Sequence, residues 1–353
     1  LNTGTSGSVT STFAGGVWTA SGAIADVNTL LSGLTFTPSL NYNSNFSIAT
    51  SVDDGIAPAI TGTKVMTGTA VNDAPQATNL SAGETYTEDT PLNLTDIVVS
   101  DVDSANITVT LTLSDPAAGV LNTDTSGSVT STFVGGTWTA SGAIADVNNL
   151  LAGLTFTPAT NYNSSFTIAT SVDDGIAPAI TGTKVMTGTP VNDAPQATNL
   201  SAPETYTEDT ALDLTDIVVS DVDSANVTVT LTLSDPSAGS LNMGNAGTVT
   251  STYNAVSGTW SASGAIGDVN ALLAGLTFTP ATNYNSNFTI ATSVDDGIAP
   301  AITGTKFMTG TAVNDVPVAT DNTVSTNEDT AFSFATTDFT FTDVENNALA
   351  VSY

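Results

Sequence analysis

The sequence predicts an all-β fold, in which antiparallel β-sandwiches of about seven strands follow one another in tandem. First, the chain repeats with a spacing of 120 residues, because residues 1–80 and 121–200 are identical at 70 of 80 positions. Second, short segments alternate apolar residues with threonine. Third, turn-forming residues separate these segments. A period of 120 residues is the size of a domain, so each repeat can bury a core of its own.

A short motif marks the boundaries between repeats. Val-Asn-Asp-Ala-Pro stands at 71–75 and 191–195, and Val-Asn-Asp-Val-Pro stands at 313–317. We therefore expect a linker at each of these positions. The predicted domains are the C-terminal part of a truncated repeat (1–72), two complete repeats (73–192 and 193–314) and the N-terminal part of a further truncated repeat (315–353).

Alternation predicts the strands. Residues 106–113, 154–157 and 166–170 place an apolar side chain at every second position with threonine between, which is typical of strands with one buried face. Gly, Pro, Asn and Asp punctuate the intervening stretches, for example at Asp115-Pro116 and Asp174-Gly175.

One segment in each repeat has helical spacing. In residues 141–154 the apolar residues fall three or four positions apart, so we expect one short helix that Ser141 caps and Gly153 ends. Trp138, with its counterparts Trp18 and Trp260, is expected to anchor the core.

The charge balance excludes several functions. There are 34 acidic residues against three basic ones, a net charge of −31, and the three basic residues are Lys64, Lys184 and Lys306. Nucleic-acid binding and attachment to a membrane surface both require Lys or Arg clusters, so neither is expected. No apolar run reaches the length of a membrane span, so no membrane insertion is expected in this segment.

The chain lacks the side chains of most catalytic sites. It has no His and no Cys, so thiol chemistry, disulfides and soft metal sites are not expected. Only paired carboxylates could serve an enzyme, as in glycosidases. These carboxylates recur in every repeat and belong to the boundaries, so we expect no enzyme.

Threading a repeat as antiparallel strands sorts its acidic motifs to two ends. In the repeat 73–192, Asp101-Val-Asp103 and Asp173-Asp174-Gly175 fall at the end where the preceding linker enters, here called the near end. Glu88-Asp89-Thr90 falls at the opposite, far end, together with Asn161.

These motifs converge at the linkers. Around 191–195 the chain offers Glu88 from one repeat, Asn192 and Asp193 from the linker, and the acidic motifs of the next repeat. Asp221 and Asp223 are expected to share a face because positions i and i+2 do so in extended backbone. So many carboxylates would repel one another without a cation. Ca²⁺, which takes six to eight oxygen ligands of mixed kind, fits better than Mg²⁺.

The same reasoning at each linker gives the predicted metal ligands. They are Asn72, Asp73, Asp101, Asp103, Asp173 and Asp174 at the first linker; Glu88, Asn192, Asp193, Asp221, Asp223, Asp295 and Asp296 at the second; and Glu208, Asn314, Asp315, Asp343 and Glu345 at the third.

This pattern resembles cadherin-type repeats, and more closely the cadherin-like repeats of large secreted bacterial adhesins. The resemblance rests on the Val-Asn-Asp-Ala-Pro linker, Glu-Asp-Thr at 88–90 and 208–210, Asp-x-Asp at 101–103 and 221–223, and Asp-Asp-Gly at 173–175 and 295–297. It implies cadherin- or Ig-like sandwiches arranged as an elongated rod, with joints stiffened by Ca²⁺. Asn161-Tyr-Asn163 stands where the cadherin pattern has Asp-x-Glu, which leaves one to three ions per joint open.

The resemblance implies a calcium-stiffened extender in an extracellular or cell-surface adhesin, which projects a binding domain for cell adhesion or biofilm formation. The expected partners are neighbouring repeats of the same chain and, through other domains, a host or abiotic surface. The alternative is a repeat protein that binds through the repeats themselves, either to like chains in an extracellular filament or matrix, or to a ligand such as an ice or sugar surface through its threonine-rich strand faces. Alternating threonine is, however, also what any strand-rich surface needs.

Overall fold

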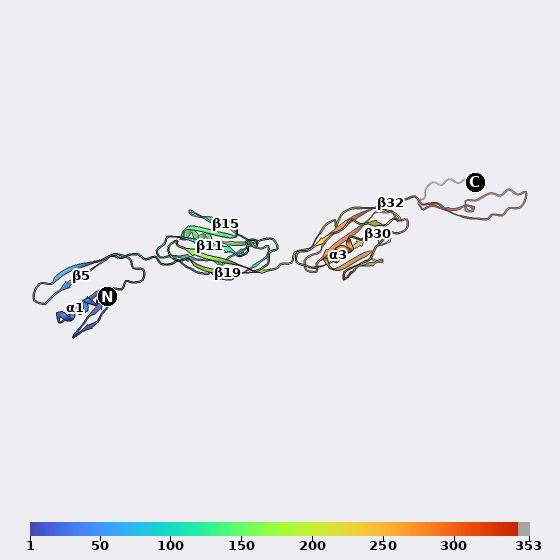
Figure 1. Ribbon diagram of the computed structural model, residues 1–353. Coiled ribbons are helices and arrows are strands. Elements are labelled where there is room, and N and C mark those ends of the chain that lie inside the picture. Colours follow the sequence, from blue (N-terminus) through green and yellow to red (C-terminus); the bar gives the residue numbers. More distant parts are fainter. Residues whose placement is uncertain (345–353) are drawn as a thin grey trace. The chain divides into compact units, whose positions relative to one another are not determined.

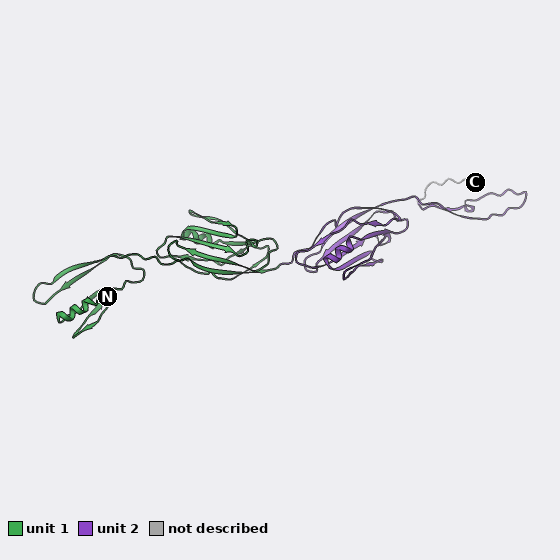
Figure 2. Cartoon of the chain, in the orientation of Figure 1, with its two compact units in different colours: residues 1–190 green, residues 191–353 purple. Residues whose placement is uncertain are grey.

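The computed structural model describes residues 1–344. The chain divides into two compact units, Leu1–Pro190 and Val191–Tyr353 (Figure 2). The first contains the core of the predicted repeat 73–192, called the second repeat below, and the second contains the core of repeat 193–314, the third repeat. The exact repeat boundaries stay predictions.

Strands dominate both complete repeats, as predicted (Figure 1). The strands of the second repeat are β7 Gln76–Ala77, β8 Glu84–Thr87, β9 Leu92–Asn93, β10 Val99–Ser100, β11 Asn106–Leu113, β12 Gly119–Leu121, β13 Thr125–Ser126, β14 Val129–Thr130, β15 Thr132–Val134, β16 Thr137–Ala143, β17 Thr155–Pro158, β18 Phe166–Asp173 and β19 Ile180–Thr189. The alternation of residues 106–113 therefore predicts β11 without error at either end.

The third repeat has the same elements. Its strands are β20 Gln196–Ala197, β21 Glu204–Thr207, β22 Leu212–Asp213, β23 Val219–Ser220, β24 Asn226–Leu233, β25 Gly239–Leu241, β26 Asn245–Ala246, β27 Val249–Thr250, β28 Thr252–Asn254, β29 Thr259–Ala265, β30 Thr277–Pro280, β31 Phe288–Asp295 and β32 Ile302–Thr311. A 3-10 turn, η1 Pro236–Ala238, precedes β25.

The incomplete ends contain fewer elements. Residues 1–72 hold β1 Thr5–Ser6, β2 Val9–Thr10, β3 Thr12–Ala14, β4 Val17–Thr19, α1 Ile24–Ser32, β5 Phe46–Val52 and β6 Ile60–Met66. The described part of the last piece holds β33 Val318–Thr320, η2 Thr336–Asp338 and β34 Thr340–Thr342.

Two sheets form each complete sandwich. In the second repeat the large sheet has the order β15-β16-β11-β18-β19-β8, and a three-stranded sheet has the order β12-β17-β9. Neighbours in the large sheet are antiparallel except β8 and β19, which run parallel over four residue pairs. The third repeat has the same two sheets. The predicted all-β sandwich is therefore confirmed for both repeats.

The core of each sandwich is aromatic at its centre. Tyr86, Phe156 and Phe166 pack with ring centroids 5.1–5.9 Å apart, and Trp138 and Trp260 are fully buried, as predicted for the core anchors. The indole N–H of Trp138 donates to the Asn122 carbonyl at 3.0 Å, so the buried ring leaves no polar atom unpaired.

One helix per repeat covers the core. The helix of the second repeat is α2 Ile144–Ala152, with Gly153 at its C-cap as predicted, and it buries Val147, Leu150 and Leu151. The third repeat has α3 Ile266–Leu273. The cap prediction for Ser141 is wrong: it lies in β16, and its hydroxyl pairs with that of Thr108 at 2.8 Å. Its segment continues the strand because Ala140 faces the core.

A helix side chain substitutes for a missing strand partner. The amide of Asn148 on α2 donates to the carbonyl of Val99 and accepts from its N–H, both at 2.9 Å. This pair of hydrogen bonds satisfies Val99 on the edge of β10 that faces away from its partner strand β7. In residues 1–344 no helix is long and apolar enough to cross a membrane.

Candidate metal centre

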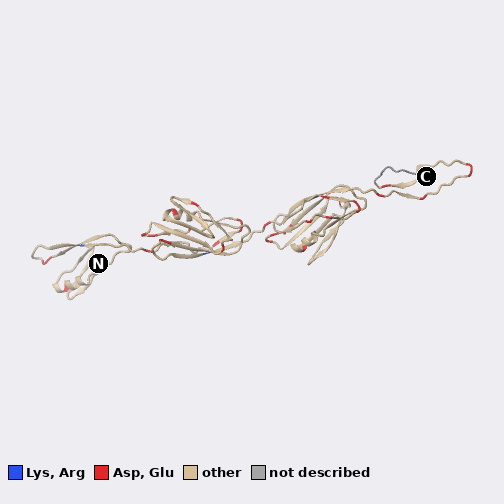
Figure 3. Ribbon diagram, turned by 45° about the horizontal axis from the view of Figure 1, so that its top comes forward, with Lys and Arg blue, Asp and Glu red and all other residues tan. Residues whose placement is uncertain are grey.

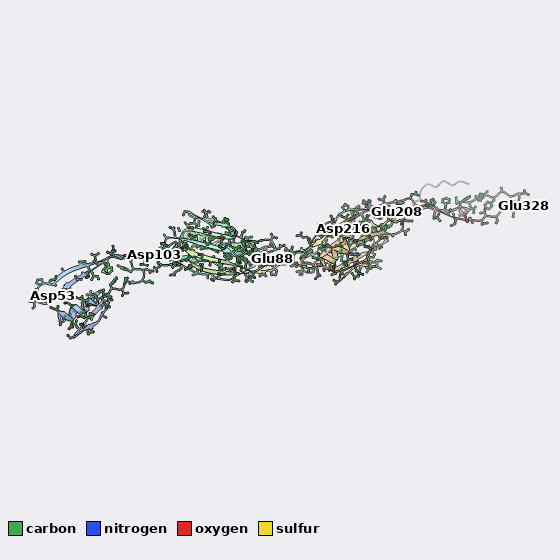
Figure 4. All side chains as sticks on the ribbon, in the orientation of Figure 1. Asp53, Glu88, Asp103, Glu208, Asp216 and Glu328 are labelled. Atoms are coloured by element: carbon green, nitrogen blue, oxygen red, sulfur yellow. The ribbon has the colours of Figure 1, made fainter. Side chains whose placement is uncertain are left out.

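The near end of each repeat is built by two acidic turns. Asp103 lies between β10 and β11, Asp173 is the last residue of β18, and Asp174 follows it directly. The register pairs Asp173 with Thr108, near the start of β11, so both turns lie at one end of the large sheet. Figure 4 labels Asp103 and Glu88 at opposite ends of the second repeat, as the threading predicted.

The linker is tied to both turns. The side-chain amide of Asn72 donates to Asp174 Oδ2 at 2.6 Å and to the carbonyl of Asp73 at 2.8 Å. The backbone N–H of Asp73 donates to Asp103 Oδ2 at 2.7 Å. The structure therefore brings together four of the predicted ligands of the first linker.

The third repeat reproduces these contacts. Asn192 donates to Asp296 Oδ2 at 2.6 Å, and the N–H of Asp193 donates to Asp223 Oδ2 at 2.8 Å. The two complete repeats, which are nearly identical in sequence, thus form the same linker contacts. At the last linker, the Asn314 amide donates in the same way to the Asp315 carbonyl at 2.7 Å.

The predicted conformation of the Asp-x-Asp motif is wrong. Asp101 and Asp103 do not lie on extended backbone, because Asp101 Oδ1 accepts hydrogen bonds from the N–H groups of Asp103 and Ser104 at 2.8 and 2.7 Å. This is an Asx turn, which short acidic side chains form readily. Asp221 forms the same turn with Asp223 and Ser224.

One carboxylate oxygen in each turn lacks a hydrogen bond. Asp101 Oδ2 and Asp221 Oδ2 are both shielded from solvent and have no hydrogen-bond partner. A carboxylate oxygen without water or a donor is costly, by about 1–3 kcal/mol or more for a charged group. Such an atom fits a cation as its missing partner.

One carboxyl of the second acidic turn has a lowered pKa in each complete repeat. The pKa of Asp174 lies below its usual value because of the Asn72 amide and then the N–H groups of Ile176 and Ala177. The pKa of Asp296 is lowered mainly by the N–H of Ile298 and then by Asn192. Asp173 differs: its Oδ1 accepts from the N–H of Gly175 at 2.7 Å, and the linker amide contacts Asp174 instead.

The far end contains a buried glutamate. Glu208 is 1% exposed, and its two oxygens accept from the Asn285 amide at 2.9 Å and from the backbone N–H of Val313 in the next linker. Glu88, also 1% exposed, accepts from Asn163 at 2.8 Å. The Asn-x-Asn that replaces the expected acidic pair thus supplies a hydrogen-bond donor to the glutamate.

Close backbone approach shapes this end. A side chain on Gly310 would lie 2.3 Å from the Asn285 carbonyl and 2.8 Å from the hydroxyl of Tyr206, so only glycine fits there. A tyrosine completes the far end: Tyr284 donates to Asp235 Oδ2 at 2.8 Å. Burial first, and then Asp235, raise the pKa of Tyr284 to about 12.

The carboxylates do not form a closed cage. Among residues 1–344, no three or more His, Cys, Asp or Glu side chains are grouped closely enough to hold a metal ion by themselves. Asp343 is half-buried beside the described end, and Glu345 lies outside the described residues. Any ion at the near end would therefore also need amide, backbone carbonyl or water oxygens.

Sequence reasoning missed the ionic pair inside each sandwich. Lys184 is fully buried, and its ammonium donates to Glu84 Oε1 at 2.9 Å; Lys306 and Glu204 are also 2.9 Å apart. The N–H and hydroxyl of Thr95 donate to the two Glu84 oxygens at 2.9 and 3.1 Å. The signal was present, since Lys184 shares the alternation of the buried Met186.

The comparisons found likeness only among solved structures; no family model and no curated protein matches the chain. Human CDH23 EC21-23 is 13% identical, over 77% of this chain and 80% of its own, with a TM-score of 0.37. Protocadherin gammaB7 EC3-6 is 12% identical over 85% of this chain and 68% of its own length, with a TM-score of 0.36. The human desmocollin-1 ectodomain is 11% identical over 81% of this chain and 51% of its own length, with a TM-score of 0.31. The chain therefore spans about half of that ectodomain. The fold of this chain rests on its own strand pairing and cores.

Proposed function

We propose that this chain is a calcium-stiffened extender of a secreted or cell-surface bacterial adhesin. The observation that carries the proposal is the shielded, unpaired Oδ2 of Asp101 and of Asp221 at the near end of each complete repeat. Each lies in a turn whose neighbouring aspartate is hydrogen-bonded to the linker. A cation at this position would satisfy the oxygen and join the turn to the linker.

Ca²⁺ suits this donor set. It accepts six to eight oxygens from carboxylates, amides, backbone carbonyls and water, whereas zinc and copper sites use the His and Cys that the chain lacks. The residues that would hold it are Asp101, Asp103 and Asp73 at the first linker and Asp221, Asp223 and Asp193 at the second. The number of ions per joint stays at one to three.

The far end supports a stiff joint as well. Glu208 is buried at the end of its own repeat and accepts from the linker residue Val313. The linker is thus held by the repeat that precedes it, and the near-end turns would hold it from the repeat that follows. With a bound cation, the carboxylates attract a shared charge; without it, they repel one another.

Repetition favours a mechanical role. The two complete repeats have the same sheets, the same core and the same near-end contacts, so the individual repeat contributes length. We propose that the chain lies outside the cell and projects another domain toward a host or abiotic surface, in adhesion or biofilm formation. The second candidate, association with like chains, has its own supporting observation in the strand faces described below.

Calorimetric titration with Ca²⁺ tests the site. The double variant Asp221→Ala, Asp223→Ala should lose the ions of one linker and leave those of the other. Its matched control is Asp213→Ala, Asp216→Ala, which removes the same charge from exposed positions of the same repeat. Undiminished stoichiometry in the first variant would overturn the ligand assignment.

X-ray scattering tests the stiffening. With Ca²⁺ the maximum dimension should be longer and better defined than with a chelator. The Asp221, Asp223 variant should stay flexible at the 191–195 linker in both media, so Ca²⁺ should change its profile less than that of the parent. An identical scattering profile with and without chelator would overturn the proposed role of the ion.

A further inference from the structure

One face of the large sheet consists almost entirely of hydroxyl side chains. In the second repeat the register aligns one row across five strands, from β15 to β19 (Figure 1). We call this surface the hydroxyl face; its central row is Thr132, Thr139, Thr110, Ser171 and Thr181. The alternate residues, such as Trp138 and Leu111, are buried in the core, so this face is the outer one.

The third repeat preserves this row. Its members are Thr252, Ser261, Thr230, Ser293 and Thr303. The next row of the second repeat is Val134, Thr137, Thr112, Ala169 and Thr183, which adds three hydroxyls and two apolar side chains to the same face. A face of this kind is therefore a property of the repeat.

The hydroxyl face carries almost no charge. In a chain of net charge −31, the only ionised side chain on its strands that faces outward is Asp173 in the second repeat, or Asp295 in the third, at the near-end margin. The acidic residues otherwise lie in loops and turns, on the helix or, for Asp213, on β22 of the three-stranded sheet, and Glu84 and Lys184 point inward to each other (Figure 3). This face is thus the surface where a second, equally acidic chain would meet the least repulsion.

Removing water from the hydroxyl face should require little free energy. The hydroxyls of Thr108 and Ser141 are 2.8 Å apart, and those of Thr112 and Thr137 are 3.2 Å apart; the third repeat has the same two pairs at the same distances. Because these hydroxyls already have partners across the strands, they stay satisfied when water leaves. The threonine methyl groups are then free to make apolar contacts.

We propose that the hydroxyl face docks against the hydroxyl face of a second copy of this chain. Five strands about 4.8 Å apart, three to ten residues long at about 3.3 Å a residue, give roughly 600 Å² per repeat. One facing pair then buries about 1,200 Å² in total, at the lower limit of stable interfaces. The face is self-complementary because each hydroxyl can donate or accept.

A neutral polysaccharide is the less favoured occupant. Sugar rings pack on exposed aromatic side chains, and the described hydroxyl face of the second repeat has none; Val185 stands there where the third repeat has Phe307. Lateral pairing of chains rests on the second candidate function and does not depend on the calcium joints, so either proposal can fail without the other.

Sedimentation equilibrium of the 353-residue protein in chelator tests the proposal. Raising the salt from ~0.01 M to ~1 M shortens the screening length from about 30 Å to about 3 Å. The protein should change from monomer to a species of twice its mass as salt and concentration rise. Thr110→Glu with Thr230→Glu, which places a charge on each face, should keep it monomeric throughout.

The matched control is Thr157→Glu with Thr279→Glu, which adds the same charges at exposed positions of the three-stranded sheet and should dimerise like the parent. If the central substitutions unfold the repeats, judged by circular dichroism, Thr181→Glu with Thr303→Glu replaces them at exposed positions of the same rows. A parent that stays monomeric at all salts overturns the proposal. So does dimerisation of folded face variants, or binding of dextran without self-association.

Discussion

A carboxylate shielded from water needs a partner for each oxygen, and the carboxylates inside the sandwich differ in this respect from those at its near end. Glu84 is compensated completely by its own chain, with the Lys184 ammonium at 2.9 Å and the Thr95 N–H and hydroxyl on its oxygens. At the near end, Asp101 has backbone donors on one oxygen and no partner on the other. The interior pair is self-sufficient, whereas the near end keeps one shielded carboxylate oxygen without a donor, which under the proposed function a cation would complete.

The two groups differ in how many of their hydrogen-bond and charge partners the chain itself supplies. A buried pair holds two strands of one repeat and loses its function only by mutation. If the near-end turn binds a cation as proposed, it can gain or lose this partner in solution, and its contribution to stability should depend on the medium.

Breaking the interior pair should cost the most. Lys306→Met leaves Glu204 charged and buried, so we expect a loss of about 3–5 kcal/mol in the free energy of unfolding of the third repeat. Adding Glu204→Gln should recover most of it, because glutamine keeps the acceptor for Thr215 without the charge. Denaturant unfolding measures both, and neither effect should depend on Ca²⁺.

Lys184→Met is the internal control, since it should destabilise only the second repeat. If Lys306→Met alone left the unfolding free energy unchanged, the pair would contribute nothing and the contrast with the near end would fail.

Calcium should stabilise the near end reversibly. At a concentration about 100 times Kd, an ion that binds only the folded state adds ~2.7 kcal/mol, which a thermal melt with and without chelator detects. Asp221→Asn should remove this gain for its own site and, without Ca²⁺, should leave the stability equal or higher, because it removes a shielded charge that lacks a partner. Asp213→Asn, at an exposed position on β22, should keep the full gain. Equal gains in the two variants would contradict the assignment.

The smallest expected effect is on pH dependence. The pKa of Asp174 is lowered in the folded state, chiefly by Asn72, so the unfolded chain binds more protons between that pKa and the ordinary value near 3.9. This stabilisation is fully present above about pH 4 and is lost as the pH falls through the folded pKa. Asn72→Ala should raise the pKa of Asp174 in a carboxyl NMR titration, whereas Asp54, lowered by the N–H groups of Ala57 and Ile56, should not move.

The fold could be predicted largely because its signals are local. Alternation identified β11, and apolar spacing placed α2 with its end at Gly153. The prediction that Ser141 caps the helix was wrong because serine occurs both at helix caps and in strands. The packing of Ala140 in the core keeps the segment in β16. The inward alternation of Lys184 was visible, but Glu84 lies 100 residues away and nothing in the sequence pairs them.

The sequence predicted which residues meet at the candidate site better than it predicted the conformation of their turns. The threading placed Asp103 and Glu88 at opposite ends, and the linker contacts of Asn72 and Asp73 follow that scheme. The Asx turn of Asp101 was missed, since a backbone turn and an extended strand fit the same Asp-x-Asp spacing. Which aspartate of the Asp-Asp-Gly turn meets the linker depends on the turn itself, and the structure selects Asp174.

The parallel pairing of β8 and β19 has a consequence for a chain under tension. The polypeptide enters a repeat before β8 and leaves it after β19, at opposite ends, so pulling on the chain slides these two strands past each other lengthwise. The hydrogen bonds of the four paired residues then resist together, rather than opening one after another as in a hairpin pulled apart. The Lys184–Glu84 pair joins the same two strands and opposes the same sliding motion.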